Sequence, residues 1–85
     1  MKDMKDFKAK KQELEMELTK AYNESNNKKF SATKEKLVEL CREKANSVGK
    51  KYGLTYQFVK VDGAIRMIFE IKWDFNDQAS IIETL

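Results

Sequence analysis

Two runs of alternating apolar and polar residues, separated by Asp62-Gly63, form the clearest pattern in the chain. An Asp-Gly pair between alternating runs predicts a β-hairpin with a two-residue type I′ turn. Such a turn fixes the register, so that Val61 pairs with Ala64 and Leu54 pairs with Ile71. We therefore expect a hairpin over about residues 54–75. Its apolar face would carry Leu54, Tyr56, Phe58, Ile65, Met67, Phe69, Ile71, Trp73 and Phe75.

Upstream of the hairpin, apolar residues recur at helical spacing in two segments. The first helix is predicted over about residues 4–22, and Lys11 interrupts its apolar stripe. Either the start of this helix projects beyond the core, or Lys11 lays its stem along the core. Residues 23–29 are polar and predict a loop. The stripe consists of Met4, Phe7, Leu14, Leu18 and Ala21 or Tyr22.

The second helix is predicted over about residues 32–52, with Ser31 or Thr33 as its N-cap. Gly53 is the expected stop, because glycine accepts left-handed backbone angles at low cost, and Gly49 is the earlier alternative. Its stripe consists of Leu37, Leu40 or Cys41, Ala45, Val48 and Tyr52.

These elements predict a small α+β domain of two layers in the order α-α-β-β. An antiparallel pair of helices would cover one face of a two-stranded antiparallel hairpin, which is marginally stable when uncovered. The 85 residues suffice for one domain, 1–85, with one modest core. Residues 76–85 are expected to form a short tail or helix.

Both hairpin strands would be sheet edges, and the hairpin has no proline to block pairing. We therefore expect a homo-oligomer, most simply a two-fold dimer that extends the sheet or packs hairpins against each other. The alternative is a monomer whose tail covers one edge. The residues expected at the oligomer or partner edge are Val59, Val61, Arg66, Ile68, Ile81 and Ile82.

Residue types that carry catalysis are scarce. The chain has no histidine and one cysteine, Cys41, which is predicted to be a small buried hydrophobe on the second helical stripe. Asp74 and Asp77 could hold a hard cation weakly, but a solvated turn explains them better. We therefore expect no enzyme, no metal and no cofactor.

Composition also bears on location. The first twenty residues are rich in Lys, Asp and Glu, unlike a signal peptide. No apolar run approaches the ~18 residues that a membrane helix needs. A single free thiol fits a reducing compartment, so a cytoplasmic protein without membrane contact is expected.

Clusters of basic residues give the strongest functional indication. The net charge is +3, and the segments 1–11, 28–36 and 42–51 each carry a surplus of lysine or arginine. An antiparallel helix pair would gather these residues at two opposite poles, where they could neutralise phosphates. The candidate nucleic-acid-binding residues are Lys5, Lys8, Lys10, Lys11, Lys28, Lys29, Arg42, Lys44, Lys50 and Lys51.

Two functions follow as hypotheses. The first is largely non-specific nucleic-acid binding, because lysine outnumbers arginine and base reading prefers arginine. RNA is favoured over DNA, since no helix suited to the DNA major groove is evident. The second is a regulator or inhibitor of a partner enzyme, such as an anti-defence or antitoxin-like factor. It would dock by strand addition at the free hairpin edge or through the apolar tail, and could act together with bound RNA. The Lys- and Asn-rich, proline-free composition resembles that of small phage accessory proteins, in line with the second hypothesis.

Overall fold

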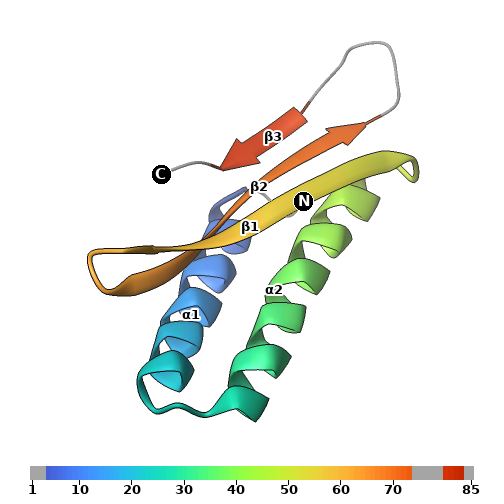
Figure 1. The fold of residues 1–85 in the computed structure, drawn as a ribbon. Coiled ribbons are helices and arrows are strands. Elements are labelled where there is room, and N and C mark those ends of the chain that lie inside the picture. Colours follow the sequence, from blue (N-terminus) through green and yellow to red (C-terminus); the bar gives the residue numbers. More distant parts are fainter. Residues whose placement is uncertain (1–3, 74–79, 84–85) are drawn as a thin grey trace.

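The chain folds into two layers, a pair of antiparallel helices and a three-stranded antiparallel sheet (Figure 1). The computed structural model describes residues 4–73 and 80–83. The elements are α1 (Met4–Asn23), α2 (Asn27–Val48), β1 (Tyr52–Val61), β2 (Ala64–Trp73) and β3 (Ser80–Glu83), and the sheet order is β1-β2-β3. The predicted α+β class and the α-α-β-β order are confirmed.

The hairpin between β1 and β2 has the predicted register throughout. Val61 pairs with Ala64, Phe58 with Met67 and Leu54 with Ile71. Both turn residues have positive φ, 52° at Asp62 and 83° at Gly63, as a type I′ turn requires. Glycine supplies the second of these angles without steric cost.

Helix α2 begins and ends earlier than its sequence suggested. Its N-cap is Asn26, whose side chain accepts a hydrogen bond from the Lys29 backbone N–H at 3.2 Å. The predicted caps at Ser31 and Thr33 are therefore wrong, because Asn26 satisfies the free N–H groups one turn sooner. At the other end the helix stops at Gly49, the earlier alternative, and Gly53 lies within β1.

The core forms where β2 crosses the two helices. The helix-facing side chains of β2 are all buried, namely Ile65, Met67, Phe69, Ile71 and Trp73. They pack with Phe7 and Leu18 of α1 and with Leu37, Cys41 and Ala45 of α2. The Trp73 indole N–H also donates to the Ala45 carbonyl oxygen at 2.9 Å, which anchors the strand to α2.

Strand β1 is buried less than its alternation predicted. Leu54 and Phe58 are half-buried, and Tyr56 is 46% exposed, although all three alternate in phase with the core. The reason is position, since β1 is the outer strand of the sheet and β2 is central. Phe75, the last residue of the predicted apolar face, lies outside the described residues.

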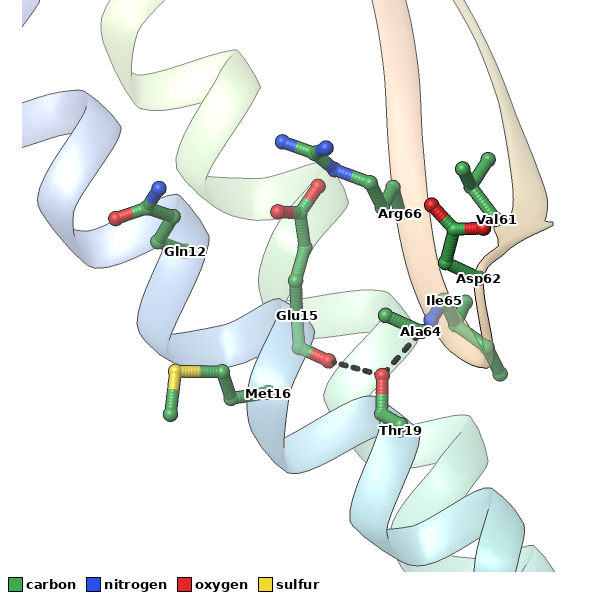
Figure 2. Close-up of a pocket in the computed structure, with 9 residues that line it drawn as sticks. All are labelled: Gln12, Glu15, Met16, Thr19, Val61, Asp62, Ala64, Ile65 and Arg66. Atoms are coloured by element: carbon green, nitrogen blue, oxygen red, sulfur yellow. Dashed lines mark hydrogen bonds between the residues drawn. The ribbon is translucent and has the colours of Figure 1, made fainter. Parts of the chain in front are cut away.

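The outer edge of β2 is closed, contrary to the expectation that both hairpin strands are edges. The tail contributes β3 in place of the expected helix or irregular tail, and it covers this edge as the stated alternative supposed. Strand β3 pairs with the second half of β2 from Phe69↔Glu83 to Lys72↔Ser80. In the first half, the Ile65 N–H donates to Thr19 Oγ1 and the Met67 N–H donates to Glu15 Oε2, both at 2.8 Å. Figure 2 shows the Thr19 hydroxyl between the two elements, where it also donates to the Glu15 carbonyl oxygen.

The outer edge of β1, by contrast, pairs with no strand among the described residues. In a two-residue hairpin Val61 and Ala64 form a hydrogen-bonded pair. From there, every second residue of each strand bonds to the other strand, and the residues between them point their N–H and C=O groups away from the hairpin. On β2 this rule selects Ile65 and Met67, the two residues whose N–H groups bond to α1. On β1 it selects Leu54, Tyr56, Phe58 and Lys60, so the whole ten-residue length of β1 is an open edge of the sheet among the described residues.

Candidate nucleic-acid interface

A row of aromatic rings and ammonium groups crosses one flank of the molecule, where the end of α1, the start of α2 and β1 meet. Lys60 Nζ lies 4.8 Å from the centroid of the Tyr22 ring, and the Tyr22 and Phe30 ring centroids are 6.0 Å apart. Lys34 Nζ lies 5.2 Å from the Phe30 centroid and 5.2 Å from the Phe58 centroid. We call Lys60, Tyr22, Phe30, Lys34, Phe58 and Tyr56 the cation–aromatic row.

Local sequence spacing accounts for the row. Tyr22 occupies the last turn of α1, and Phe30 and Lys34 lie one turn apart near the start of α2. The short connection between the helices brings these turns together. The members from β1 are two residues apart along the strand, so their side chains lie on the same side of the sheet.

The two tyrosines at the row are partly open to solvent. Tyr22 is 47% exposed and Tyr56 is 46% exposed, whereas Phe30 and Phe58 are half-buried and pack against the core. Tyr56 meets Phe58 edge to face, with ring centroids 5.9 Å apart. The phenylalanines and lysines thus hold the tyrosine rings in place, and exposed rings offer π-faces on which bases can stack.

A groove of about 560 Å³ runs beside the row between α2 and the open edge of β1. Lys34, Val38, Tyr56 and Phe58 give it an apolar floor with one cation, and Glu35, Glu39 and Arg42 line its outer part. Arg42 Nη1 and Glu39 Oε2 are 3.8 Å apart, and both side chains are more than half exposed. An exposed pair of this kind contributes little to stability, so Arg42 is available to another anion at small cost.

The predicted basic poles exist, with different members than expected. The antiparallel helices set the first half of α1, with exposed Lys8, toward the end of the molecule where α2 finishes and Lys50 and Lys51 precede β1. Lys10, also exposed, lines the groove between the helices instead. Lys44, near the end of α2, is half-buried. Exposed Lys28 and Lys29 lie at the other end, in the first turn of α2 and next to the cation–aromatic row. Lys5 belongs to α1, but its side chain is outside the described part of the chain.

Lys11 lies inside the protein and does not belong to either pole. It is 3% exposed, its Nζ is 2.6 Å from Glu15 Oε2, and it lies 5.8 Å from the centroid of the Phe69 ring. Of the two alternatives expected at Lys11, the structure has the one in which Lys11 lies along the core. Because its charge is engaged by Glu15, Lys11 is withdrawn from the candidate phosphate ligands.

The outer groove between the helices separates the two poles with acidic side chains. Its lining includes four glutamates against two lysines, and Glu35, Glu39 and Glu43 follow one another at a spacing of four residues on α2. Like charges at this spacing repel one another and would repel phosphate. A nucleic-acid strand is therefore not expected to follow this groove. The lining residues are Lys10, Glu13, Leu14, Ala32, Glu35, Lys36, Glu39, Leu40 and Glu43.

The residues expected at a partner edge lie mainly on the sheet face that the helices leave open. Val59, Val61, Arg66 and Ile68 are half-buried there, and Ile82 is 58% exposed. Ile81 pairs with Ile71, whose side chain is in the core, so we leave it out of this surface.

Other chemistry is limited among the described residues. Cys41 is fully buried, as predicted, and no group of three His, Cys, Asp or Glu side chains is placed to hold a metal ion in the described ranges. Asp74 and Asp77 lie outside them. Neither helix in the described part of the chain has the length and apolar character needed to cross a membrane.

Sequence reasoning missed the most distinctive part of this site. The predicted stripes assign Tyr22 and Tyr56 to the core. Lys34 belongs to the basic segment 28–36 but is not one of the candidate ligands, and Lys60 belongs to no basic segment. The available signal was position, because Tyr22 adjoins the interhelical turn and Tyr56 is on an outer strand. No family model, no curated protein and no solved structure matches this chain. Its function is therefore inferred from the geometry described above.

Proposed function

We propose that the chain is a small cytoplasmic, non-enzymatic protein that self-associates and binds single-stranded nucleic acid, RNA in preference to DNA. The observation that carries this proposal is the pair of half-exposed tyrosine rings, Tyr22 and Tyr56, in a row with Lys34 and Lys60. Proteins that bind single strands combine stacking rings with cations that follow the backbone. The cation–aromatic row has both parts on one flank.

The rings and the cations of the row would have different roles. Bases would stack on the Tyr22 and Tyr56 rings, while Lys34, Lys60 and the neighbouring Lys28 would neutralise phosphates. Stacking tolerates any base and lysine makes no bidentate base contacts, so the binding would be largely independent of sequence.

A duplex is a less suitable ligand. A helix that enters the major groove must present a cationic or neutral face, whereas the outward groove of α1 and α2 is lined by four glutamates. Unpaired bases, which RNA loops and ends supply, are the form that aromatic side chains recognise. This contrast favours single-stranded RNA over double-stranded DNA.

Ring removal tests the proposal. Tyr22→Leu and Tyr56→Leu should each weaken the binding of a fluorescent single-stranded RNA by about 5- to 150-fold, since one stacked base contributes about 1–3 kcal/mol. Tyr22→Phe and Tyr56→Phe are matched controls that keep the ring and should bind nearly as well as the wild type. Equal affinity for the leucine and phenylalanine variants, measured by fluorescence anisotropy, would refute stacking.

A second function, docking of a protein partner, is favoured by the open edge of β1. Leu54, Tyr56, Phe58 and Lys60 turn unpaired backbone groups outward beside the groove against α2, and an extended segment of a partner could add there as a strand. Leu54→Pro and Lys60→Pro each remove one outward N–H without removing a bond to β2. A protein that is captured by the wild type and by the tyrosine variants, but by neither proline variant, would support this function.

Amide hydrogen exchange separates the two functions. A bound strand should slow exchange at the outward N–H groups of Leu54, Tyr56, Phe58 and Lys60, because each becomes hydrogen-bonded. RNA stacked on side chains should leave these amides almost unchanged. Protection in the presence of RNA alone would contradict the proposed stacking mode.

A further inference from the structure

The open face of the sheet carries an apolar centre flanked by opposite charges. Ile68 lies in the middle of β2 on this face, with Val59 on β1 and Ile82 on β3 nearby. Ile82 is 58% exposed, while Val59 and Ile68 are half-buried. A hollow of about 270 Å³ on this face, lined in part by Ile68 and Ile82, leaves space for side chains of another molecule.

Arg66 and Glu70 are placed symmetrically about Ile68. Each is two residues from Ile68, so the Cβ atoms of all three lie on the same face of β2. The Arg66 side chain extends past the edge of the strand and lines a pocket with Glu15 and Met16 of α1 (Figure 2), so it would turn toward the partner on binding. No ion pair joins Arg66 to any other residue in the described ranges. Glu70 Oε2 lies 3.5 Å from Lys72 Nζ, but the two side chains are 36% and 71% exposed, and such a pair is weak.

We propose that this face binds a second copy of the chain, with the two sheets face to face and Arg66 of each copy paired with the partner's Glu70. A two-fold axis that lies between the sheets, perpendicular to β2 and level with Ile68, reverses the strand direction. It therefore sets Arg66 of each copy opposite the other copy's Glu70, which gives two such pairs in the dimer. The two Ile68 side chains meet at the axis.

The usual geometry of stacked sheets allows these contacts. Facing sheets lie about 10 Å apart with strands crossed by about 30°. Two residues along a strand span about 7 Å, so this crossing displaces Arg66 sideways from the partner's Glu70 by only about 3–4 Å. Long arginine and glutamate side chains can bridge that offset. An axis parallel to the strands would instead set Arg66 against the partner's Arg66, so charge selects the first arrangement.

The size of the face indicates a modest affinity. Strands β1 and β2 have ten residues each and are about 33 Å long, and three strands are about 14 Å wide. The face therefore offers at most about 460 Å² per copy, which is below the ~800 Å² per partner of a standard protein interface. We therefore expect a dimer that forms at micromolar concentrations. The face lies on the opposite side of the sheet from the helices and the groove against α2, so this dimer does not depend on nucleic-acid binding.

Complementary charge reversal tests the arrangement. Arg66→Glu would set two glutamates against each other at both pairs, and Glu70→Arg would set two arginines against each other. Each variant alone should therefore dimerise at least about tenfold more weakly than the wild type. An equimolar mixture of the two should form a heterodimer, because all its cross-interface pairs are then opposite. The double variant R66E/E70R should recover the homodimer. Sedimentation equilibrium on nucleic-acid-free protein measures each dissociation constant.

The controls separate loss of the interface from loss of the fold. Circular dichroism should show all variants folded, and Lys8→Glu, an exposed change on α1, should dimerise like the wild type. The proposal is overturned if the wild type is monomeric up to about 1 mM, a concentration that would reveal even weak association. It is also overturned if either single variant dimerises like the wild type, or if the mixture does not associate.

Discussion

At the scale of single residues, the Lys11–Glu15 pair is a buried ion pair that connects two elements of the fold. Glu15 Oε2 accepts from Lys11 Nζ at 2.6 Å and from the Met67 N–H at 2.8 Å, and both side chains are almost fully buried. The carboxylate therefore joins α1 to the middle of β2. A buried charge is tolerated only while its partners remain, because the desolvation cost is otherwise unmet.

Lys11→Met should lower the free energy of unfolding by about 3–5 kcal/mol, because it leaves Glu15 buried without this cation. Adding Glu15→Gln in the same chain should restore part of the loss, since a neutral amide oxygen can still accept from the Met67 N–H. Urea denaturation measures both. A Lys11→Met protein as stable as the wild type would show that Glu15 does not need the ammonium group.

At the scale of secondary-structure elements, side chains of helix α1 take the place of a neighbouring strand along the first half of β2, because they accept its outward N–H groups. Thr19 accepts from the Ile65 N–H and Glu15 accepts from the Met67 N–H, and β3 takes over from Phe69 onward. A sheet edge closed in this way cannot pair with another chain. Strand addition directly to β2 is therefore not expected, whereas the outer edge of β1 remains available.

Thr19→Val keeps the shape of the side chain but removes the acceptor for the Ile65 N–H. We expect a loss of about 1–2 kcal/mol in unfolding free energy and faster hydrogen exchange at the Ile65 amide, because a partly buried donor is left unpaired. Thr19→Ser, which keeps the hydroxyl, is the matched control. Unchanged exchange at Ile65 in Thr19→Val, followed by NMR, would contradict this role of α1.

The elements differ in how far the sequence predicts them, and locality explains the difference. The hairpin register follows from Asp62-Gly63 and the alternation beside it, all within adjacent residues. The start of α2 differs from the prediction because the polar residues after Tyr22 favour a loop, whereas Asn26 caps the helix and Phe30 packs against the core. Strand β3 was not predicted, since four residues pair there only because the edge of β2 is available.

The candidate site shows the same limit. The lysine poles follow from sequence and an antiparallel helix pair, so most of their members were predictable. The cation–aromatic row requires the end of α1, the start of α2 and β1 to meet, which no periodicity specifies. Tyr22 and Tyr56 were therefore assigned to the core by their spacing, although their positions at an element end and on an outer strand leave them about half exposed.

At the scale of the whole molecule, charge is arranged along a long axis. The molecule measures 45 × 21 × 20 Å, with Lys28 and Lys29 near one end and Lys50 and Lys51 near the other. The cation–aromatic row adjoins the first pair, and glutamates line the outward groove between the helices. A nucleic-acid strand bound at the cation–aromatic row should therefore contact Lys28 and Lys29, and it should reach Lys50 and Lys51 only if it is long.

Salt dependence can show which lysines the strand contacts. Log K falls as log salt concentration rises, and each phosphate neutralised on a single strand adds about 0.7 to the magnitude of that slope. For RNA of about six nucleotides, Lys28→Gln with Lys29→Gln should lower the slope by about 1.4, while Lys50→Gln with Lys51→Gln should leave it unchanged. For RNA of about twenty nucleotides, both double variants should lower the slope.

Tyr22→Leu should weaken binding to either RNA without changing the slope, since stacking releases no counterions. Equal slopes for the two double variants on the short RNA would place the strand elsewhere on the molecule and remove the cation–aromatic row from the site.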